Sequence, residues 1–525
     1  MTVSEASPCP AQRPAADASP GGVHTGLDWR FLLGVARLGR VALVGPHDDA
    51  EVAALGELAE TVDRYRSVTT LGDSVAAYDV VSARDVPAGA AALLLFEMRP
   101  GGWLHVQPTS SRAAVRWAAA LRRLGEVPTS VWHAPSAAAR SYLVPLDTGG
   151  GVRHVLTRYD GVRADQARAS AARLALRLGA RRVVLRDRSV VAHRADERAQ
   201  DLVRGYLARQ DGNRLPEWTA AAGLAPVYLT PKFPSSRHVI AMLVEAGSGR
   251  PRLVAKLPRH PGDRGPIERE ARLLRHLPTT APAPALIALD EHDGQPLLLQ
   301  SVVTGRPLSP RQVRRDPGEA IALGLELLRR LPVTRTTSND PGWWDRLLAE
   351  PLTGFADLQP DERPLVERTL RALAPLRGAV LPLVVEHGDL SHPNLLVRDG
   401  RLHAVDWELG EMSGLPGHDL TFFLQYVAEA RDGTATPAQQ CAVFDSAFLT
   451  RSGWARTALT RYLRNLSVDE ELLPALVVAS WARRATARVA SVTSPDLPPR
   501  GRPLDPLVGV RELMLWRYAV RHLDC

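Results

Sequence analysis

One short segment holds the residues whose types and spacing best suit chemistry. Asp389 and Asn394 stand five residues apart in a loop, and Asp406 follows Asn394 by twelve residues at the end of the apolar run 402–405. Phosphoryl transfer from a nucleotide needs a carboxylate that accepts the hydroxyl proton, and it needs oxygen ligands for Mg²⁺. Asp389 suits the first role. Asn394 and Asp406 suit the second, because a hairpin could return the Asp406 carboxylate to the same metal.

The same segment resembles the signature of the aminoglycoside phosphotransferase and choline kinase family, a branch of the protein-kinase-like fold. That signature is His-Gly-Asp, an Asn five residues after the Asp, and an Asp-Trp-Glu step, which stand here at 387–389, 394 and 406–408. The resemblance covers roughly residues 225–525. It implies an α+β kinase-like domain that uses ATP and Mg²⁺.

Upstream, the resemblance implies a nucleotide-binding set. Lys256 is similar to the strand lysine that contacts the α- and β-phosphates, and Glu270 to its ion-pair partner on the next helix. Glu268 is set aside because it points to another face of that helix. The loop expected to cover the phosphates has no glycine, so Ser235 and Ser236 are the candidates, since hydroxyls and backbone N–H groups can cradle an anion.

Two further residues are expected to support the loop. The segment 414–420 is similar to the family's Gly-x-Pro…Asp segment, which implies that Asp419 buttresses the catalytic loop. His387 is expected to anchor the loop and to take no proton in the mechanism. His392 suits a contact to substrate or packing within the loop equally well.

The elements that must position these residues fit a multidomain globular protein. The chain has 525 residues, 45% of them hydrophobic and 23% charged, which excludes a collagenous, wholly disordered or many-pass membrane chain. Only two of its 65 basic residues are lysines, Lys232 and Lys256, and only four residues are asparagines. A coding bias toward arginine explains this composition, so the positions of Lys256 and Asn394 are informative.

Charge and cysteine usage bound the partners and the compartment. The net charge is +8, but the arginines are spread among acids without long runs, so we expect no nucleic-acid partner. Three cysteines without a CxxC pair indicate a reducing compartment, and the cytoplasm is expected. No apolar run reaches the 18 residues of a membrane span, so no membrane partner is expected.

Composition and periodicity divide the chain into four parts. Residues 1–26 are rich in Pro, Ala, Ser and Gly and indicate a disordered lead. Strands alternate with helices in 27–200, which predicts an α/β Rossmann-like domain. A linker is expected at 201–224, and the α+β kinase-like domain at 225–525.

Residues 28–150 partly resemble a Rossmann-like methyltransferase that uses S-adenosylmethionine, on strand 41–44 and the Arg-Pro-Gly-Gly turn at 99–102. The cofactor loop of such enzymes needs several glycines, whereas Gly45 is alone and precedes a proline. Asp63 is the nearest acid for the ribose. We expect a degenerate domain, and binding of S-adenosylmethionine is the less favoured alternative.

The expected function is ATP-dependent phosphorylation of an alcohol. The acceptor is a small molecule, such as a sugar, an aminoglycoside-like compound or an amino alcohol, or a peptide Ser or Thr. An aminoglycoside would favour an acidic pocket, whereas the stretch 481–484 is basic. The alternatives are a non-catalytic scaffold with two degenerate domains and a bifunctional methyltransferase-kinase. Use of GTP in place of ATP, the oligomeric state and the pathway stay open.

Overall fold

The computed structural model describes residues 27–125, 127–134, 141–146, 148–157, 188–194, 201–209, 223–230, 237–450, 452–493 and 510–523. The chain separates into two compact units. We call Ser19–Glu268 with Leu286–Val302 the sheet unit, and Arg269–Ala285 with Val303–Cys525 the helical unit. The predicted lead 1–26 and the serines Ser235 and Ser236 lie outside the described residues.

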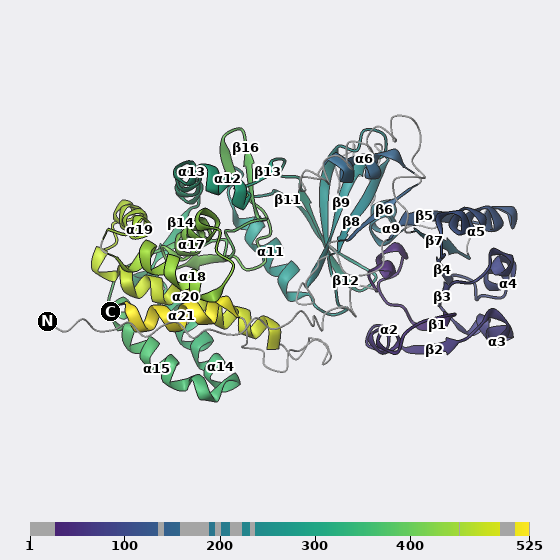
Figure 1. The fold of residues 1–525 in the computed structure, drawn as a ribbon, viewed down its shortest axis with the longest axis horizontal. Helices are drawn as coiled ribbons and strands as arrows, with labels where there is room; N and C mark the ends of the chain where they lie inside the picture. Colours follow the sequence, from purple (N-terminus) through teal and green to yellow (C-terminus); the bar gives the residue numbers. More distant parts are fainter. Residues whose placement is uncertain are drawn as a thin grey trace. The chain divides into compact units, whose positions relative to one another are not determined.

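The sheet unit is built on one mixed sheet of twelve strands in the order β11-β12-β10-β9-β8-β6-β5-β7-β4-β3-β1-β2 (Figure 1). Its strands are β1 (Arg40–Val44), β2 (Thr61–Tyr65), β3 (Val80–Arg84), β4 (Trp103–Gln107), β5 (Thr129–His133), β6 (Ser141–Pro145), β7 (Arg188–His193), β8 (Leu224–Thr230), β9 (His238–Glu245), β10 (Pro251–Pro258), β11 (Leu286–His292) and β12 (Gln295–Ser301). Its helices within the described ranges are η1 (Asp28–Leu32), α2 (Asp49–Leu55), α3 (Val68–Leu71), η2 (Gly72–Ala77), η3 (Ala88–Ala90), α4 (Ala91–Phe96), α5 (Ser111–Arg123), α6 (Gly149–Thr157) and α9 (Leu202–Arg209).

The first part of this sheet is parallel. Strands β2, β1, β3 and β4 are neighbours that run in the same direction. Strand β7 then lies between β4 and β5 and is antiparallel to both. In β1, Val41 and Leu43 pack into one core while Ala42 and Val44 pack into the core on the opposite face. A strand that is apolar on both faces is typical of a parallel sheet covered on both sides.

The second part of the sheet is antiparallel and joins the first directly. Strand β6 pairs with β8 in the register Ser141 to Thr230, Tyr142 to Leu229 and Leu143 to Tyr228. Strands β8, β9 and β10 form an antiparallel meander. Strand β12 then pairs with β10, and β11 pairs with the other side of β12, both antiparallel. Trp29 and Trp132 from the first part and Leu243 and Leu253 from the second share one hydrophobic core. The two parts therefore share both a sheet and a core.

The helical unit contains the remaining helices and two small sheets, β13-β16-β17 and β14-β15-β18. Its α-helices within the described ranges, apart from α11, are α12 (Pro310–Arg315), α13 (Pro317–Arg329), α14 (Glu350–Leu358), α15 (Arg363–Ala372), α16 (Ala374–Arg377), α17 (His418–Asp432), α18 (Pro437–Phe444), α19 (Trp454–Asn465), α20 (Leu473–Thr493) and α21 (Arg511–His522). Its strands are β13 (Arg306–Pro307), β14 (Val333–Thr336), β15 (Pro382–Glu386), β16 (Leu395–Arg398), β17 (Arg401–Ala404) and β18 (Glu411–Gly414). Its short 3₁₀-helices are η4 (Thr337–Asn339), η6 (Pro360–Glu362) and η8 (Glu470–Leu472), and its π-helices are η5 (Asp345–Ala349) and η7 (Asp445–Leu449).

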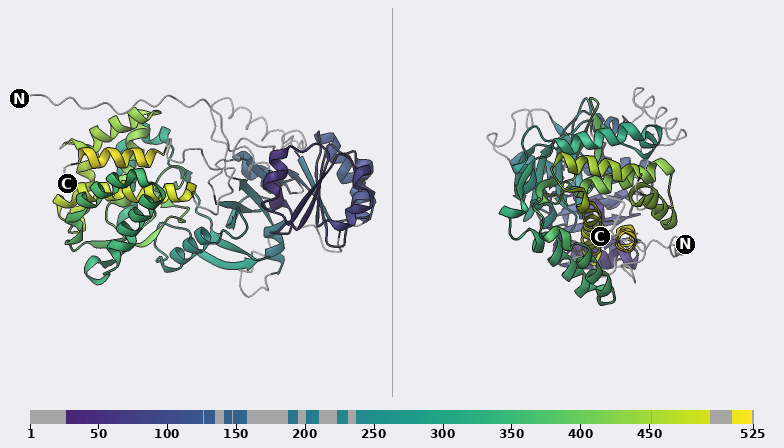
Figure 2. Two further views of the ribbon diagram at one scale, coloured as in Figure 1. Left: turned by 90° about the horizontal axis from the view of Figure 1, so that it is seen from below. Right: turned by 90° about the vertical axis from the view of Figure 1, so that its left-hand side faces the viewer.

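Helices α20 and α21 pack side by side in this unit (Figure 2). Helix α17 begins after Gly417 and ends at Gly433, and both glycines have positive φ, at 88° and 66°. A left-handed residue just past the last turn is a common helix end. The glycines therefore set the bounds of α17, whose first turn carries Asp419.

The two units do not coincide with the predicted domains. Helix α9 and the start of β8 fall within the expected linker 201–224, and both belong to the sheet unit. Helix α11 (Gly265–His276) runs from the sheet unit into the helical unit. The functional division of the chain stays a prediction. None of the helices in the described ranges is both long and apolar enough to cross a membrane.

Candidate functional site

The loop that carries Asp389 follows strand β15. Gly388 in this loop has a φ of 82°, and a Cβ at this position would lie 2.5 Å from the carbonyl oxygen of Leu409. Both the left-handed backbone and the close approach require glycine. The glycine of the His-Gly-Asp motif thus allows the loop to fold against the segment after Asp406.

The carboxylate of Asp419 holds this loop by two hydrogen bonds to its backbone. Its Oδ2 accepts the backbone N–H of His387 at 2.6 Å, and its Oδ1 accepts the backbone N–H of Gly388 at 2.9 Å. Burial, with the nearby charge of Glu386, raises the pKa of the Asp419 carboxyl to about 7, and the two backbone donors oppose that rise. Asp419 therefore ties the backbone of two successive loop residues to the first turn of α17.

His387 uses both ring nitrogens within the loop. Its Nε2 donates to the carbonyl oxygen of Val405 at 3.0 Å, and its Nδ1 accepts the backbone N–H of Asp389 at 3.1 Å. The ring is fully buried and meets the Trp407 ring edge-on at 4.6 Å. These contacts tie the loop to the hairpin that precedes Asp406, which is an anchoring arrangement.

The Asp389 carboxylate has three donors around it. Asn394 Nδ2 donates to Oδ2 at 2.9 Å, Ser391 Oγ donates to Oδ1 at 3.4 Å, and Arg484 Nη2 donates to Oδ1 at 3.1 Å. The Asp389 side chain is 33% exposed. Since a carboxylate has about four acceptor positions, Oδ2 keeps room for a substrate hydroxyl.

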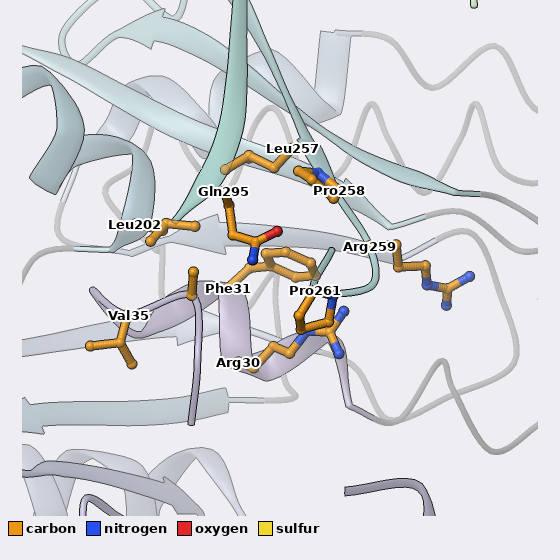
Figure 3. A pocket seen from close by; sticks show the side chains of 10 residues that line it. Arg30, Phe31, Val35, Leu202, Leu257, Pro258, Arg259, Pro261 and Gln295 are labelled. Atoms are coloured by element: carbon orange, nitrogen blue, oxygen red, sulfur yellow. The ribbon is translucent and has the colours of Figure 1, made fainter. Parts of the chain in front are cut away.

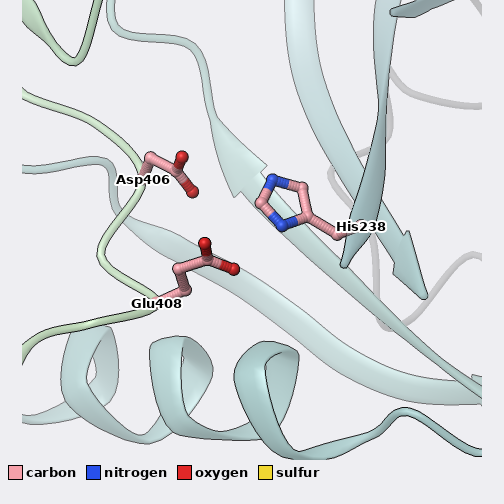
Figure 4. A group of neighbouring side chains, drawn as sticks. All are labelled: His238, Asp406 and Glu408. Atoms are coloured by element: carbon pink, nitrogen blue, oxygen red, sulfur yellow. The ribbon is translucent and has the colours of Figure 1, made fainter. Parts of the chain in front are cut away.

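The hairpin β16–β17 brings Asp406 back to the loop. The backbone N–H of Val405 donates to the carbonyl oxygen of Asn394 at 2.9 Å. Asp406 itself has a φ of 73°, a left-handed conformation that is uncommon outside glycine and frequent at functional sites. Carboxylate oxygens of Asp406 and Glu408 lie within 4.8 Å of one another (Figure 4). Hard oxygen donors at this separation suit a divalent cation such as Mg²⁺.

Glu270 and Lys256 are both buried, in different units. Glu270, on α11, accepts the backbone N–H of Trp407 at 3.4 Å, which connects this helix to the Asp406 segment. Lys256 lies in β10 opposite Ile240 of β9 and Leu298 of β12, with 1% of its surface exposed. The ion pair between Lys256 and Glu270 stays a prediction.

Helix α20 contributes two adjacent arginines for which no role was predicted. Both terminal nitrogens of Arg483 donate to the buried Glu386 carboxylate, at 2.7 and 2.8 Å. Arg484 bonds Asp389, as described above. Glu408 was recognised in the sequence only as the last residue of the Asp-Trp-Glu step, and no role was predicted for it. The basic stretch 481–484 was visible in the sequence, but its partners lie nearly 100 residues away.

Residues 238–466 match the sequence profile described as the phosphotransferase enzyme family. The matched segment is a little under half of the chain. The match confirms the family resemblance inferred from the His-Gly-Asp and Asp-Trp-Glu motifs, and it supports a kinase-like domain in the carboxyl-terminal part of the chain. A search of curated proteins found no match to the chain.

Several solved structures in the phosphotransferase family are similar to this chain. Aminoglycoside phosphotransferase APH(4)-Ia is 13% identical, with a TM-score of 0.37, over 57% of this chain and 94% of its own. A thermostable mutant of that protein, in ternary complex with ADP and hygromycin B, gives 13% and 0.36 over 57% and 94%. The streptomycin-ATP-APH(2")-IIa ternary complex gives 16% and 0.30 over 50% and 96%.

In the sheet unit, side chains bond one another beside the carboxyl ends of the parallel strands β1 and β3. Chain order reverses between β1 and β3, which is where open α/β sheets bind ligands. Here Arg84 Nη1 donates to the carbonyl oxygen of Pro46 at 3.2 Å, and Nη2 donates to Glu51 at 2.9 Å. Glu51 also bonds the buried ring of His47 at 3.1 Å. A Cβ on Gly45 would lie 2.1 Å from the carbonyl oxygen of Arg84.

A small pocket lies beside η1 in the same unit (Figure 3). Its walls include Phe31 and Leu257, the buried guanidinium of Arg30, and the buried side chain of Gln295. The Gln295 Oε1 accepts the backbone N–H of Gly262 at 3.3 Å. The pocket lies between the first described residues and the end of β10, the strand that carries Lys256.

Proposed function

We propose that this protein is an ATP-dependent phosphotransferase that acts on a hydroxyl group of a small molecule. The observation that carries the proposal is the geometry around Asp389. Its carboxylate is held by Asn394, its backbone N–H is held by His387, and the backbone of the preceding Gly388 is held by Asp419. The match of residues 238–466 to the phosphotransferase enzyme family supports the same reaction.

In the proposed reaction the acceptor hydroxyl lies against Oδ2 of Asp389. The hydroxyl oxygen attacks the γ-phosphorus, the bond between that phosphorus and the oxygen bridging it to ADP breaks, and the hydroxyl proton moves to Asp389. Transfer of this kind depends on positioning and on charge stabilisation more than on covalent chemistry. The fixed loop supplies the positioning.

Asn394 and Asp406 would hold Mg²⁺, and Glu408 is a further oxygen donor. The donor set is made of an amide and two carboxylates, which matches the preference of this ion. The Asn394 amide nitrogen faces Asp389, so its oxygen is directed away from that carboxylate. When bound, Mg²⁺ would neutralise charge on the β- and γ-phosphates.

Lys256 would contact the α- and β-phosphates and pair with Glu270, and Ser235 and Ser236 would cover the phosphates. The burial of Lys256 and Glu270 supports this assignment, since a buried lysine or glutamate is rare without a charged partner. His387 and Asp419 position the loop. The three cysteines without a CxxC pair support a reducing compartment such as the cytoplasm.

Nucleotide turnover tests the proposal. Wild-type protein should hydrolyse ATP slowly with Mg²⁺, and faster once a hydroxyl acceptor is present, whereas Asp389→Asn and Asp406→Asn should lose that turnover. Asp399→Asn is the matched control, because its side chain is 86% exposed on the same hairpin. If the wild type neither binds nor turns over ATP, the proposal is wrong and the non-catalytic scaffold is the better account.

For the first part of the chain we infer a Rossmann-like domain that binds no S-adenosylmethionine. The parallel order β2-β1-β3-β4 supports the architecture. The closed ends of β1 and β3, where Arg84 bridges Pro46 and Glu51, support the loss of the cofactor site. Calorimetry with S-adenosylmethionine tests this inference, and tight binding would favour the bifunctional alternative.

A further inference from the structure

Arg484 is presented rigidly beside the Asp389 carboxylate. Its Nη2 donates to Asp389 Oδ1 at 3.1 Å, and 13% of its side chain is exposed. The guanidinium carbon lies 3.7 Å from the ring centroid of Phe422, on α17. Because a planar guanidinium stacks on an aromatic face, Phe422 fixes the plane in which the Arg484 donors point.

Arg484 retains a donor that the described residues do not use. Its Nη1 is buried and, within those residues, has no hydrogen-bond partner. The adjacent Arg483 differs, since both of its terminal nitrogens bond Glu386. A buried guanidinium donor without an acceptor is costly, so a bound molecule that supplies an acceptor here gains affinity.

The charge that faces Arg484 also changes during the proposed reaction. Asp389 is its counter-charge, and the acceptor proton that moves to Asp389 removes that negative charge. A largely buried cation that loses its bonded carboxylate is unfavourable. The charges of Glu512 and Asp419 also act on Arg484, but Glu512 and Glu429 are bonded to Arg511, at 3.4 and 2.7 Å, and Asp419 is bonded to the backbone of His387 and Gly388. An anionic group on the substrate would supply the negative charge that Asp389 loses.

We propose that the acceptor carries an anionic group, a carboxylate or a phosphate, beside the hydroxyl that is phosphorylated, and that Arg484 binds this group. The proposal rests on the phosphotransferase function proposed above and names its substrate class. A cationic acceptor such as an aminoglycoside is disfavoured at this position by like charge. Arg484 is thus a specificity-determining residue.

Two matched sets of hydroxyl compounds test the proposal with the full-length protein. The first is glucuronate, glucose and glucosamine, and the second is glycolate, ethylene glycol and ethanolamine. Each set offers an anionic, a neutral and a cationic member. The dissociation constant of every probe is measured by calorimetry with Mg²⁺ and ADP, and acceptor-stimulated ATP turnover is measured in parallel. Circular dichroism checks that each variant is folded.

In wild-type protein the anionic member of at least one set should bind about tenfold or more tightly than its neutral and cationic counterparts, because charged hydrogen bonds are the stronger ones. Arg484→Gln should abolish this preference, and Arg484→Lys should retain part of it. Arg464→Gln should leave it unchanged, since that side chain is 76% exposed on α19.

Equal binding within both sets by the wild type, or an anionic preference that survives in Arg484→Gln, would overturn the proposal. So would an equal loss of turnover for all probes in Arg484→Gln without a change in preference, because the transferred phosphoryl group would then be the anion that Arg484 serves. These outcomes leave ATP turnover intact in the wild type. Failure of the phosphotransferase function itself is recognised separately, by the absence of ATP binding and turnover.

Discussion

The carboxylate of Asp419 accepts the backbone N–H of Gly388 at 2.9 Å and so fixes the residue that precedes Asp389. The same carboxylate holds His387 through its second oxygen. A side chain 30 residues beyond Asp389 in the sequence therefore holds the backbone that leads to the Asp389 carboxylate. This relationship leads to the first two predictions.

Replacement of Asp419 by alanine should lower phosphotransfer by about 100-fold, because misplacement of a catalytic group by about 1 Å has an effect of that size. Steady-state turnover of ATP measures the change. Asp432→Ala is the matched control and should leave turnover unchanged, since that residue is the last of the same helix and its side chain is 38% exposed. Full activity in Asp419→Ala would show that the loop holds its position without this support.

Activity should fall as the pH drops through about 7, the raised pKa of the Asp419 carboxyl. Protonation converts one of its oxygens into a donor, so Asp419 can no longer accept from both His387 and Gly388. Stability changes in the opposite direction. The unfolded carboxyl titrates near pH 4, so the folded state binds an additional proton between about pH 4 and 7, and this contribution to stability grows as the pH falls.

Turnover and thermal unfolding of wild type and Asp419→Asn, each measured from pH 5 to 8, separate these two effects. The variant is neutral at every pH and should lack both pH-dependent steps. A flat wild-type activity profile across pH 7 would show that protonation of Asp419 does not control activity. The same step in the variant would show that another group controls it.

In the helical unit, the buried charges of Arg483 and Glu386 should each depend strongly on the other for their contribution to stability. Glu386 is buried, with 2% of its side chain exposed. Arg483→Met should lower the free energy of unfolding by about 3–5 kcal/mol, since it leaves a buried charge unpaired. The double variant with Glu386→Leu should recover most of this loss. Chemical denaturation measures both, and equal stability of the single and double variants would contradict the account.

Strand β6 should couple the first part of the sheet to the strand that carries Lys256. Leu143→Ala, at a buried position opposite Tyr228, should cost about 2–5 kcal/mol in unfolding free energy. Amide exchange should then accelerate in β8 and β9 as well as in β5 and β7. Leu93→Ala, at a position that is 41% exposed, should change stability by no more than about 0.5 kcal/mol. Faster exchange confined to β5–β7 would show that the parts unfold separately.

The sequence was most informative where the site is contiguous. Asp389, Asn394 and Asp406 lie within 18 positions of one another, and their types and spacing alone pointed to phosphoryl transfer. The roles of these residues stay proposals, but the family that they indicated is confirmed by the match to residues 238–466.

The long-range contacts could not be predicted in the same way. Arg484 reaches Asp389 from 95 positions away, and arginine is so common in this chain that one more carries no signal. The continuous sheet was missed for a related reason. The β6–β8 pairing joins only three pairs of residues from distant segments, and a local sequence pattern does not reveal which distant strand is the partner.

The most direct test of the central claim is transfer of radiolabel from [γ-³²P]ATP to a hydroxyl acceptor, with Mg²⁺, by wild type and by Asp389→Asn. The account predicts a labelled acceptor with the wild type and a rate lower by about 100-fold to 10,000-fold with the variant, the usual contribution of a positioned base. Asp399→Asn should match the wild type. Equal labelling by wild type and Asp389→Asn would contradict the assignment of Asp389, and with it the proposed mechanism.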